Sequence, residues 1–277
     1  MPELPEVETI KNSLIPICVN SRIEQVLVYE PRLRERIDEN SFQKWLPGST
    51  ITQITRRSKY LLFQLNNEAV LVAHLGMSGR LGVFSSEQVR EKHTHVVIRL
   101  HRDGIEQEMR YRDPRRFGLL QIVEPGKLSV YPRFIKLGVE PLKKEFNKEY
   151  LFDKTQNSRR PIKNLLMDAE IVVGVGNIYA NEVLYICEIN PLIAAGELSL
   201  VQIEAVVQTI KKVLRQAIEA GGTTLNDYRN GKGEPGFFQL QLLAYGRDGE
   251  TCSRCGSTIV RAKSAGRSTF FCPACQK

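Results

Sequence analysis

The chain has 277 residues, a formal net charge of +8, a pI near 9.2 and 42% hydrophobic residues. This length allows two folded domains with sizeable cores, and the hydrophobic content excludes a disordered chain. The positive charge favours a polyanionic partner, and the sequence has no amphipathic Lys-rich segment, lipidation motif or apolar run of membrane-spanning length, so we expect nucleic acid and no membrane.

The residues after Met1 form the first candidate site. Removal of Met1 would give Pro2 a free secondary amine directly beside the carboxylate of Glu3. An amine that attacks a carbonyl-like carbon forms a covalent iminium, and a chain-terminal amine with a pKa of about 8 is neutral far more often than a lysine. The iminium of proline has no N–H to lose and stays cationic. Pro2 is a common residue at this position, so the alternative that it has no catalytic role remains open at this point.

Residues 5–18 have the pattern of a helix, with Pro5 in the first turn and Glu6 and Glu8 near the positive end of the helix dipole. We expect Pro16 to kink or loosen the last turn. The apolar residues of one face are Val7, Ile10, Leu14 and Ile17. Such a helix would hold the N-terminus in place, which an N-terminal nucleophile requires.

From residue 22 to residue 130 the pattern changes to short β-rich runs separated by Gly, Asn and Asp. This pattern predicts a β-sandwich or barrel-like domain. The expected strands are residues 23–29, 49–55, 60–65, 69–74, 94–100, 109–111 and 119–123. Residues 124–160 are loosely patterned and carry mixed charge, so we place the interdomain connection there.

A helical domain is expected after residue 160. Helices are predicted at residues 161–166, from 178 to about 188 with Asn177 as N-cap, and from a capping box at Ser199 and Gln202 to a stop at Gly221. The glycines before Asn177 make this helix start resemble a phosphate-binding site, although a capped helical turn needs the same residues. Residues 223–237 are rich in Gly and Asn and read as a loop of functional length.

The six cysteines fall into two groups. Cys18 and Cys187 lie in apolar stretches and are predicted to be small core residues. The other four form two CxxC pairs near the C-terminus, a spacing that predicts one structural Zn²⁺ held by four thiolates. The metal would supply the folding energy of this short tail, and four thiolates leave no open position for catalysis. The predicted ligands are Cys252, Cys255, Cys272 and Cys275.

Motifs along the whole chain resemble the formamidopyrimidine-DNA glycosylase family. They are residues 2–9 (PELPEVET), 57–61 (RSKYL), 74–79 (HLGMSG), 111–118 (YRDPRRFG), 173–179 (VGVGNIY) and the four-cysteine tail. The resemblance implies an α+β fold, in which an N-terminal β-sandwich is followed by a helical domain with a helix–two-turn–helix and a zinc finger. DNA is expected in the cleft between the domains.

The resemblance, taken together with the changes of pattern along the chain, implies four regions. Residues 1–133 form the N-terminal helix and β-sandwich catalytic domain, and residues 134–160 form the connection. Residues 161–240 form the helical domain with a lesion-recognition loop at 223–237, and residues 241–277 form the zinc-finger β-hairpin. We expect a monomer in the bacterial cytoplasm that associates with the nucleoid through DNA.

The resemblance also implies roles for individual residues. Pro2 matches the family's nucleophile, Glu3 its acid/base, and Lys59 a lysine used in elimination and phosphate binding. Arg267 matches the zinc-finger arginine, which binds phosphate and is assigned to the later elimination. Further expected DNA contacts are His74, Met77, His93, Arg115, Phe117, Arg159 and Asn177. The basic residue near 159 aligns only loosely with the family.

The implied activity is excision of oxidised purines, above all 8-oxoguanine paired with cytosine, from double-stranded DNA. Pro2 would attack C1′ of the damaged nucleotide after that nucleotide leaves the stack, and Glu3 in its acid form would assist sugar-ring opening. The resulting iminium would allow β- and then δ-elimination. Met77, Arg115 and Phe117 would fill the space left by the extruded base, where an inserted side chain offsets part of the cost of unstacking.

Two alternatives remain open. An endonuclease VIII-type glycosylase has the same scaffold and nucleophile and prefers oxidised pyrimidines. Leu4 in the opening motif, the loop at 223–237 and the set Met77, Arg115 and Phe117 favour the purine enzyme. A non-catalytic zinc-ribbon DNA-binding protein would explain the charge and the cysteines. It would leave Pro2, Glu3 and Lys59 without a role.

Overall fold

The computed structural model describes residues 2–223 and 236–277, and the chain forms two compact units. The first comprises the described residues of Met1–Ile135 and Ala220–Phe237, and the second comprises Lys136–Glu219 and Phe238–Lys277. Met1 and most of the predicted lesion-recognition loop, at residues 224–235, lie outside the described residues. None of the described helices is long and apolar enough to cross a membrane.

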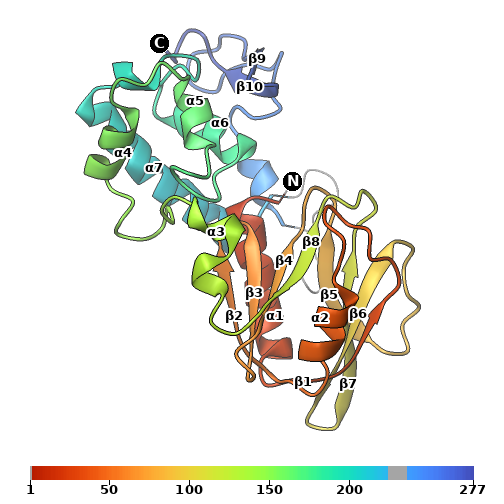
Figure 1. Ribbon diagram of the computed structural model, residues 1–277. Coiled ribbons are helices and arrows are strands. Elements are labelled where there is room, and N and C mark those ends of the chain that lie inside the picture. Colours follow the sequence, from red (N-terminus) through yellow and green to blue (C-terminus); the bar gives the residue numbers. More distant parts are fainter. Residues whose placement is uncertain (1, 224–235) are drawn as a thin grey trace. The chain divides into compact units, whose positions relative to one another are not determined.

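The first unit is a β-sandwich with a helix along its core. One antiparallel sheet has the order β1-β6-β7-β5 and the other the order β2-β3-β4-β8 (Figure 1). The strands are β1 (Arg22–Val28), β2 (Ile51–Arg57), β3 (Tyr60–Leu65), β4 (Val70–His74), β5 (Arg80–Ser85), β6 (Thr94–Arg102), β7 (Ile105–Arg112) and β8 (Leu119–Val123). Apolar side chains of both sheets and of helix α1 (Leu4–Cys18) form one buried cluster, as expected for packed sheets.

Helix α1 confirms the predicted N-terminal helix and the burial of its apolar face. Val7, Ile10 and Leu14 are in the core, as is Cys18, whereas Ile17 is only partly buried and packs against the core. Pro16 does not end the helix, because it lies on the exposed side, where the carbonyl that it leaves without a partner can reach water. The N–H of Val19 still bonds the carbonyl of Ile15 at 3.1 Å, which closes the last turn.

Strands β3 and β8 have the predicted bounds, and the other predicted strands are present with shifted ends. Strand β5 and the short helices α2 (Glu39–Trp45) and α3 (Pro132–Ile135) were not predicted. Strand β5 is the edge strand beside β7 and contains Gly82, which weakens a strand pattern. Helix α2 buries only Phe42, so its sequence lacks a clear apolar period.

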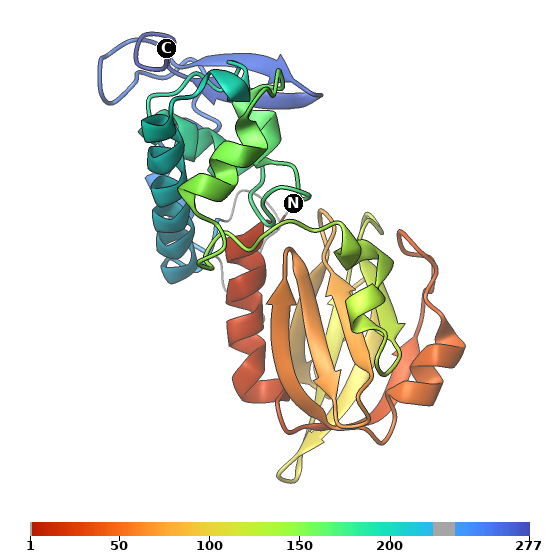
Figure 2. The ribbon, with the colours of Figure 1, turned by 60° about the vertical axis from the view of Figure 1, so that its left-hand side comes forward.

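The second unit is helical and ends in a β-hairpin (Figure 2). Its elements are α4 (Lys148–Thr155), α5 (Ile162–Leu166), α6 (Asn177–Ile186), α7 (Leu200–Glu219), β9 (Val260–Ser264) and β10 (Arg267–Phe271). The hydroxyl of Ser199 accepts from the N–H of Gln202 at 3.3 Å, and the side chain of Gln202 accepts from the N–H of Ser199 at 2.9 Å, so the predicted capping box opens α7. Gly221 and Gly222 follow α7 with positive φ angles, in agreement with the predicted stop.

Helix α4 lies inside the stretch in which we placed the interdomain connection. It buries only Leu151 and Thr155, and Asn147 caps it by accepting from the N–H of Tyr150 at 2.8 Å. Lys148 pairs with Glu204 of α7 at 3.6 Å. Helix α4 is therefore held to α7 by one narrow face, which explains the weak periodicity of its sequence.

Candidate functional site

The N-terminal residues are fixed by the first turn of α1. Glu3 is 3% exposed, and its N–H donates to the Glu6 carboxylate at 2.7 Å. Glu6 is itself 2% exposed, and Pro2 is partly buried. The backbone beside Pro2 is thus anchored within the first unit by a charge-assisted hydrogen bond.

The same Glu6 carboxylate holds the backbone that leads into residues 224–235. Its second oxygen accepts from the N–H of Thr223 at 2.8 Å. At the other end of that segment, the N–H of Phe237 bonds the carbonyl of Ala220 at 3.0 Å. A Cβ at Gly222, where φ is +84°, would lie 3.2 Å from Glu6, so glycine suits both the backbone and the contact. Glu6 therefore connects the start of α1 to a closed stem made of residues 220–223 and 236–237.

Lys59 lies in the turn between β2 and β3, beside Ser58, whose φ is +55°. Arg56 supports this turn: its guanidinium donates to the Ser58 carbonyl at 2.7 Å and to Glu8 of α1 at 2.7 Å. Arg56 and Lys11 hold the pKa of Glu8 below its usual value despite the opposing effect of burial. This ion pair links the Lys59 turn to the helix that begins beside Pro2.

His74 ends β4 and pairs with Tyr60 of β3, the residue after Lys59. Its ring lies 4.7 Å from the Tyr60 ring, and its Nδ1 accepts from the N–H of Gly76 at 3.0 Å. Burial, together with the charges of Arg34 and Lys59, lowers the pKa of His74 to about 3. The imidazole is therefore neutral near pH 7 with its proton on Nε2, which makes it a hydrogen-bond donor without charge.

Met77, Arg115 and Phe117 lie on two loops of the first unit that touch one another. Met77 is 42% and Phe117 43% exposed, and the Arg115 guanidinium lies 4.9 Å from the centre of the Phe117 ring. A Cβ at Gly76 would lie 2.4 Å from the backbone carbon of Phe117, so only glycine allows this approach of the loops. Exposed apolar side chains on closely packed loops can insert between bases.

His93 precedes β6 in the same unit, with a φ of +69°. Its ring lies 6.5 Å from that of His95, and its carbonyl accepts from the N–H of Asp113 at 3.1 Å. The first unit therefore contains the two candidate catalytic residues of the N-terminus, Lys59, and five of the candidate DNA contacts.

Asn177 and Arg267 come together in the second unit. Arg267 begins β10 and is exposed. The Asn177 amide donates to the carbonyl of the next residue, Ser268, at 3.0 Å, and Lys163 donates to the same carbonyl at 2.9 Å. The prediction of Asn177 as N-cap is wrong: Gly176 is the N-cap of α6, and the Asn177 side chain binds the hairpin instead.

Arg159 and Arg160 differ in their surroundings. The Arg160 guanidinium is paired with Asp168 at 2.9 Å. Arg159 is exposed, and its side chain makes no hydrogen bond or ion pair with any residue that the structure describes. Of the two, Arg159 is the one whose charge is available to a ligand.

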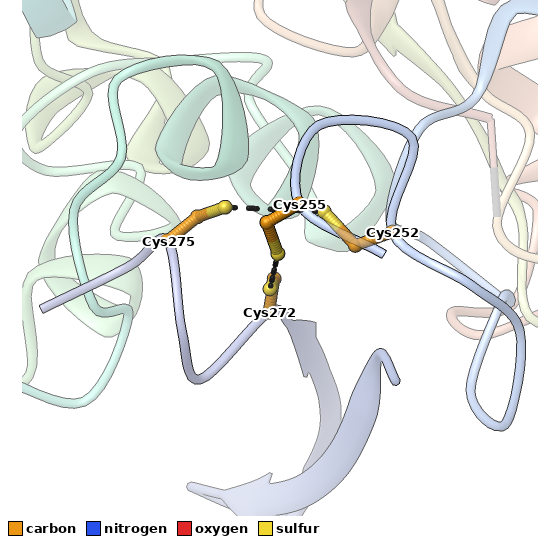
Figure 3. A group of neighbouring side chains, drawn as sticks. All are labelled: Cys252, Cys255, Cys272 and Cys275. Atoms are coloured by element: carbon orange, nitrogen blue, oxygen red, sulfur yellow. Dashed lines mark hydrogen bonds between the residues drawn. The ribbon is translucent and has the colours of Figure 1, made fainter. Parts of the chain in front are cut away.

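The four C-terminal cysteines form a group that fits a tetrahedral metal (Figure 3). Their sulfur atoms all lie within 4.8 Å of one another, with 3.5 Å between Cys255 and Cys272 and 3.9 Å between Cys252 and Cys275. A Zn–S bond of 2.3 Å corresponds to a sulfur–sulfur edge of about 3.8 Å. The donor set and its size therefore suit one structural Zn²⁺, as predicted.

The predictions did not include several buried polar residues that hold these groups: Glu6, Asp113, Lys163, Asn181 and Glu182. The Glu182 carboxylate accepts from three consecutive backbone N–H groups, those of residues 243–245, and burial raises its pKa. A detectable signal was the charge within an apolar pattern, since Lys163 stands among Ile162, Leu165 and Leu166. The partner of such a charge cannot be read from the sequence.

Comparison with known proteins agrees with this arrangement. Residues 1–120 match the formamidopyrimidine-DNA glycosylase N-terminal domain, residues 137–229 the H2TH domain of the same enzyme, and residues 249–277 the zinc finger found in FPG and IleRS. The formamidopyrimidine-DNA glycosylase of Hahella chejuensis is 44% identical over 277 residues, which are 100% of each chain.

Solved structures give the same result. A Lactococcus lactis Fpg variant in complex with Fapy-dG-containing DNA has a TM-score of 0.91 at 34% identity, with 100% of both chains covered. A MutM complex with carbocyclic 8-oxo-G-containing DNA and a Lactococcus lactis Fpg complex with oxidised-pyrimidine-containing DNA each have a TM-score of 0.90, 34% identity and the same coverage. The chain therefore belongs to the formamidopyrimidine-DNA glycosylase family of DNA-repair enzymes, and its four-cysteine tail is the zinc finger of that family.

Proposed function

We propose that the protein is a bifunctional DNA glycosylase and AP lyase that removes oxidised purines from duplex DNA through a Schiff base on Pro2. The observation that carries this proposal is the anchored start of α1, where the Glu3 N–H binds buried Glu6 and Pro2 precedes it. A nucleophile at a chain end needs such a support, since free termini fray.

In the glycosylase step, the neutral Pro2 nitrogen forms a bond to C1′ as the bond from C1′ to the damaged base breaks, and the proton of the Pro2 amine passes to the departing base. Glu3 gives a proton to the sugar ring oxygen as the ring opens, which leaves a cationic iminium between Pro2 and C1′. The reaction requires that Met1 has been removed, because an acylated nitrogen is not a nucleophile.

The lyase steps use the iminium as an electron sink. Loss of a C2′ proton expels the 3′ phosphate, and a second elimination expels the 5′ phosphate. Water then hydrolyses the iminium and releases Pro2. Lys59 and Arg267 bind phosphates and assist these eliminations, since a positive charge stabilises each leaving phosphate.

The remaining candidates are the proposed DNA contacts. Met77 and Phe117 occupy the space of the extruded nucleotide, and Arg115 donates hydrogen bonds to the orphaned partner base. Phosphates are bound by neutral His74 and by His93 in the first unit, and by Arg159 and Asn177 in the second. The protein acts as a monomer on bacterial chromosomal DNA, and Zn²⁺ supplies folding energy to the hairpin.

Borohydride trapping on a duplex with 8-oxoguanine opposite cytosine tests the covalent step. The wild-type protein should give a covalent complex whose intact mass lacks Met1. A variant with one residue added before Pro2 should give none, whereas Pro2→Gly, with a primary amine, should retain partial trapping. An active enzyme that yields no trapped complex would refute the scheme.

Substrate preference needs a separate comparison, because a relative has been solved with DNA that contains an oxidised pyrimidine. Excision rates should be measured on matched duplexes with 8-oxoguanine or thymine glycol. We expect the purine lesion to be removed faster. Faster removal of thymine glycol would support an endonuclease VIII-type enzyme, and lesion-independent binding without cleavage would support a DNA-binding module.

A further inference from the structure

Asp113 is a fully buried residue directly after β7. One oxygen of its carboxylate accepts from the Ser78 hydroxyl at 2.6 Å and from the N–H of Arg115 at 3.3 Å. The other oxygen accepts from the N–H of Gly118 at 2.8 Å. The buried charge is thus satisfied by donors from two different loops, which is the condition for keeping a carboxylate inside a protein.

The backbone of Asp113 reaches a third segment. Its N–H donates to the carbonyl of His93 at 3.1 Å, and its own carbonyl lies 2.7 Å from Nε2 of His95. A carbonyl only accepts, so the His95 ring is protonated on Nε2. Asp113 therefore joins the segment 93–95, the loop 75–79 and the loop 113–118.

These three segments carry the side chains proposed to enter or line the DNA: Met77, His93, Arg115 and Phe117. Met77 and Phe117 are more than two fifths exposed, so their own burial contributes little to the loop conformation. Ser78 bonds Asp113 and also accepts from the N–H of Arg115 at 3.2 Å, so one hydroxyl fixes both loops.

We propose that Asp113, together with Ser78, is a positioning residue: it holds Met77, Arg115 and Phe117 in the geometry required to insert into the duplex and keep the damaged nucleotide extruded, and it holds His93 in position to bind phosphate. The proposal rests on the proposed function. In this role Asp113 contacts neither the substrate nor the nucleophile. The chemistry at Pro2 should therefore continue when Asp113 is replaced.

The matched pair Ser78→Ala and Ser49→Ala tests this role. Both serines are buried in the first unit, and the Ser49 hydroxyl donates to the Leu46 carbonyl at 2.6 Å. Two reactions are compared: excision of 8-oxoguanine from a duplex, which needs extrusion, and borohydride trapping at an abasic site in single-stranded DNA, which needs Pro2 but no gap filling. Asp113→Asn is the second variant.

We expect Ser78→Ala and Asp113→Asn to lower duplex excision by about 10- to 100-fold, the range for displaced positioning groups. Trapping on single-stranded abasic DNA should stay close to wild type, and Ser49→Ala should retain both activities. Equal losses of both reactions in Ser78→Ala would indicate a merely structural role and overturn the proposal. So would duplex excision equal to that of Ser49→Ala.

Amide hydrogen exchange separates this proposal from the proposed function, because it needs no reaction. In the free protein, the amides of Arg115 and Gly118 should exchange faster in Ser78→Ala and Asp113→Asn than in Ser49→Ala. Unchanged exchange would overturn the role of Asp113. If exchange changes but the wild-type protein shows no lesion-dependent activity, the proposed function fails and the positioning of the loops by Asp113 stands.

Discussion

Burial beside two positive charges makes His74 a neutral donor, and this neutral state lowers the stability of the folded protein at low pH. The pKa of His74 is about 3 in the folded protein, whereas an unfolded histidine titrates near 6.5. Between these values the unfolded chain binds more protons than the folded one. Stability from this residue is therefore complete above about pH 6.5 and is lost as the pH falls towards 3.

The pH dependence can be measured by unfolding His74→Gln and wild type at pH 7 and pH 5. The wild-type protein should lose about 2 kcal/mol of stability from this residue between the two pH values, a loss that the variant lacks. His101→Gln is the control, because His101 lies on β6 and is partly exposed. Identical pH profiles for His74→Gln and wild type would mean that His74 titrates normally.

At the scale of elements, Glu6 joins the start of α1 to the stem formed by residues 220–223 and 236–237. Both of its oxygens accept from backbone N–H groups, those of Glu3 and Thr223. A glutamine in this place presents an NH₂ group to one of these donors. The affected N–H then stays buried without an acceptor.

We expect Glu6→Gln to destabilise the protein by about 1–3 kcal/mol and to lower trapping by Pro2. The control is Glu24→Gln, an exposed residue of β1. Thermal unfolding and single-turnover trapping are measured side by side. Wild-type behaviour of Glu6→Gln in both measurements would show that α1 and the stem are not coupled through this carboxylate.

Local patterns predicted the elements whose burial follows a simple period. Helices α1 and α7 and strands β3 and β8 were found because apolar residues or caps mark them. Helix α4 and strand β5 were missed because contacts with larger elements stabilise them, whereas their own sequences have only a weak periodic pattern. The sequence itself singled out Pro2 and Glu3 and predicted the zinc ligands, and the family resemblance supplied the other site residues. The buried groups that support them, such as Glu6 and Asp113, depend on contacts between distant segments.

For the molecule as a whole, the zinc finger is a small part with little core of its own. Its apolar cluster contains only a few residues besides the cysteines, among them Ile259 and Phe270. Such a segment depends on its metal for folding. Loss of Zn²⁺ should therefore remove the structure of residues 249–277 and leave the first unit folded.

This expectation is tested with Cys272→Ser and the control Cys187→Ser, whose sulfur lies 3.3 Å from the Thr209 hydroxyl and outside the four-cysteine group. Native mass spectrometry should find one zinc in the control and none in Cys272→Ser. Limited proteolysis should then cut Cys272→Ser within the tail. DNA binding by this variant should also weaken, because Arg267 is no longer held in the hairpin. Full zinc content in Cys272→Ser would contradict the assignment of the ligands.

The way in which the hairpin is held has a consequence for how the protein can change. Asn177 and Lys163 bind the carbonyl of Ser268, and Asn181 accepts from the N–H of Phe270 at 2.7 Å. These contacts recognise backbone atoms, which every sequence provides. Two further contacts recognise the buried side chains of Thr269 and Ser264. The exposed side chains of the hairpin can therefore be exchanged, by evolution or by design, without changing the contacts that hold the hairpin in place.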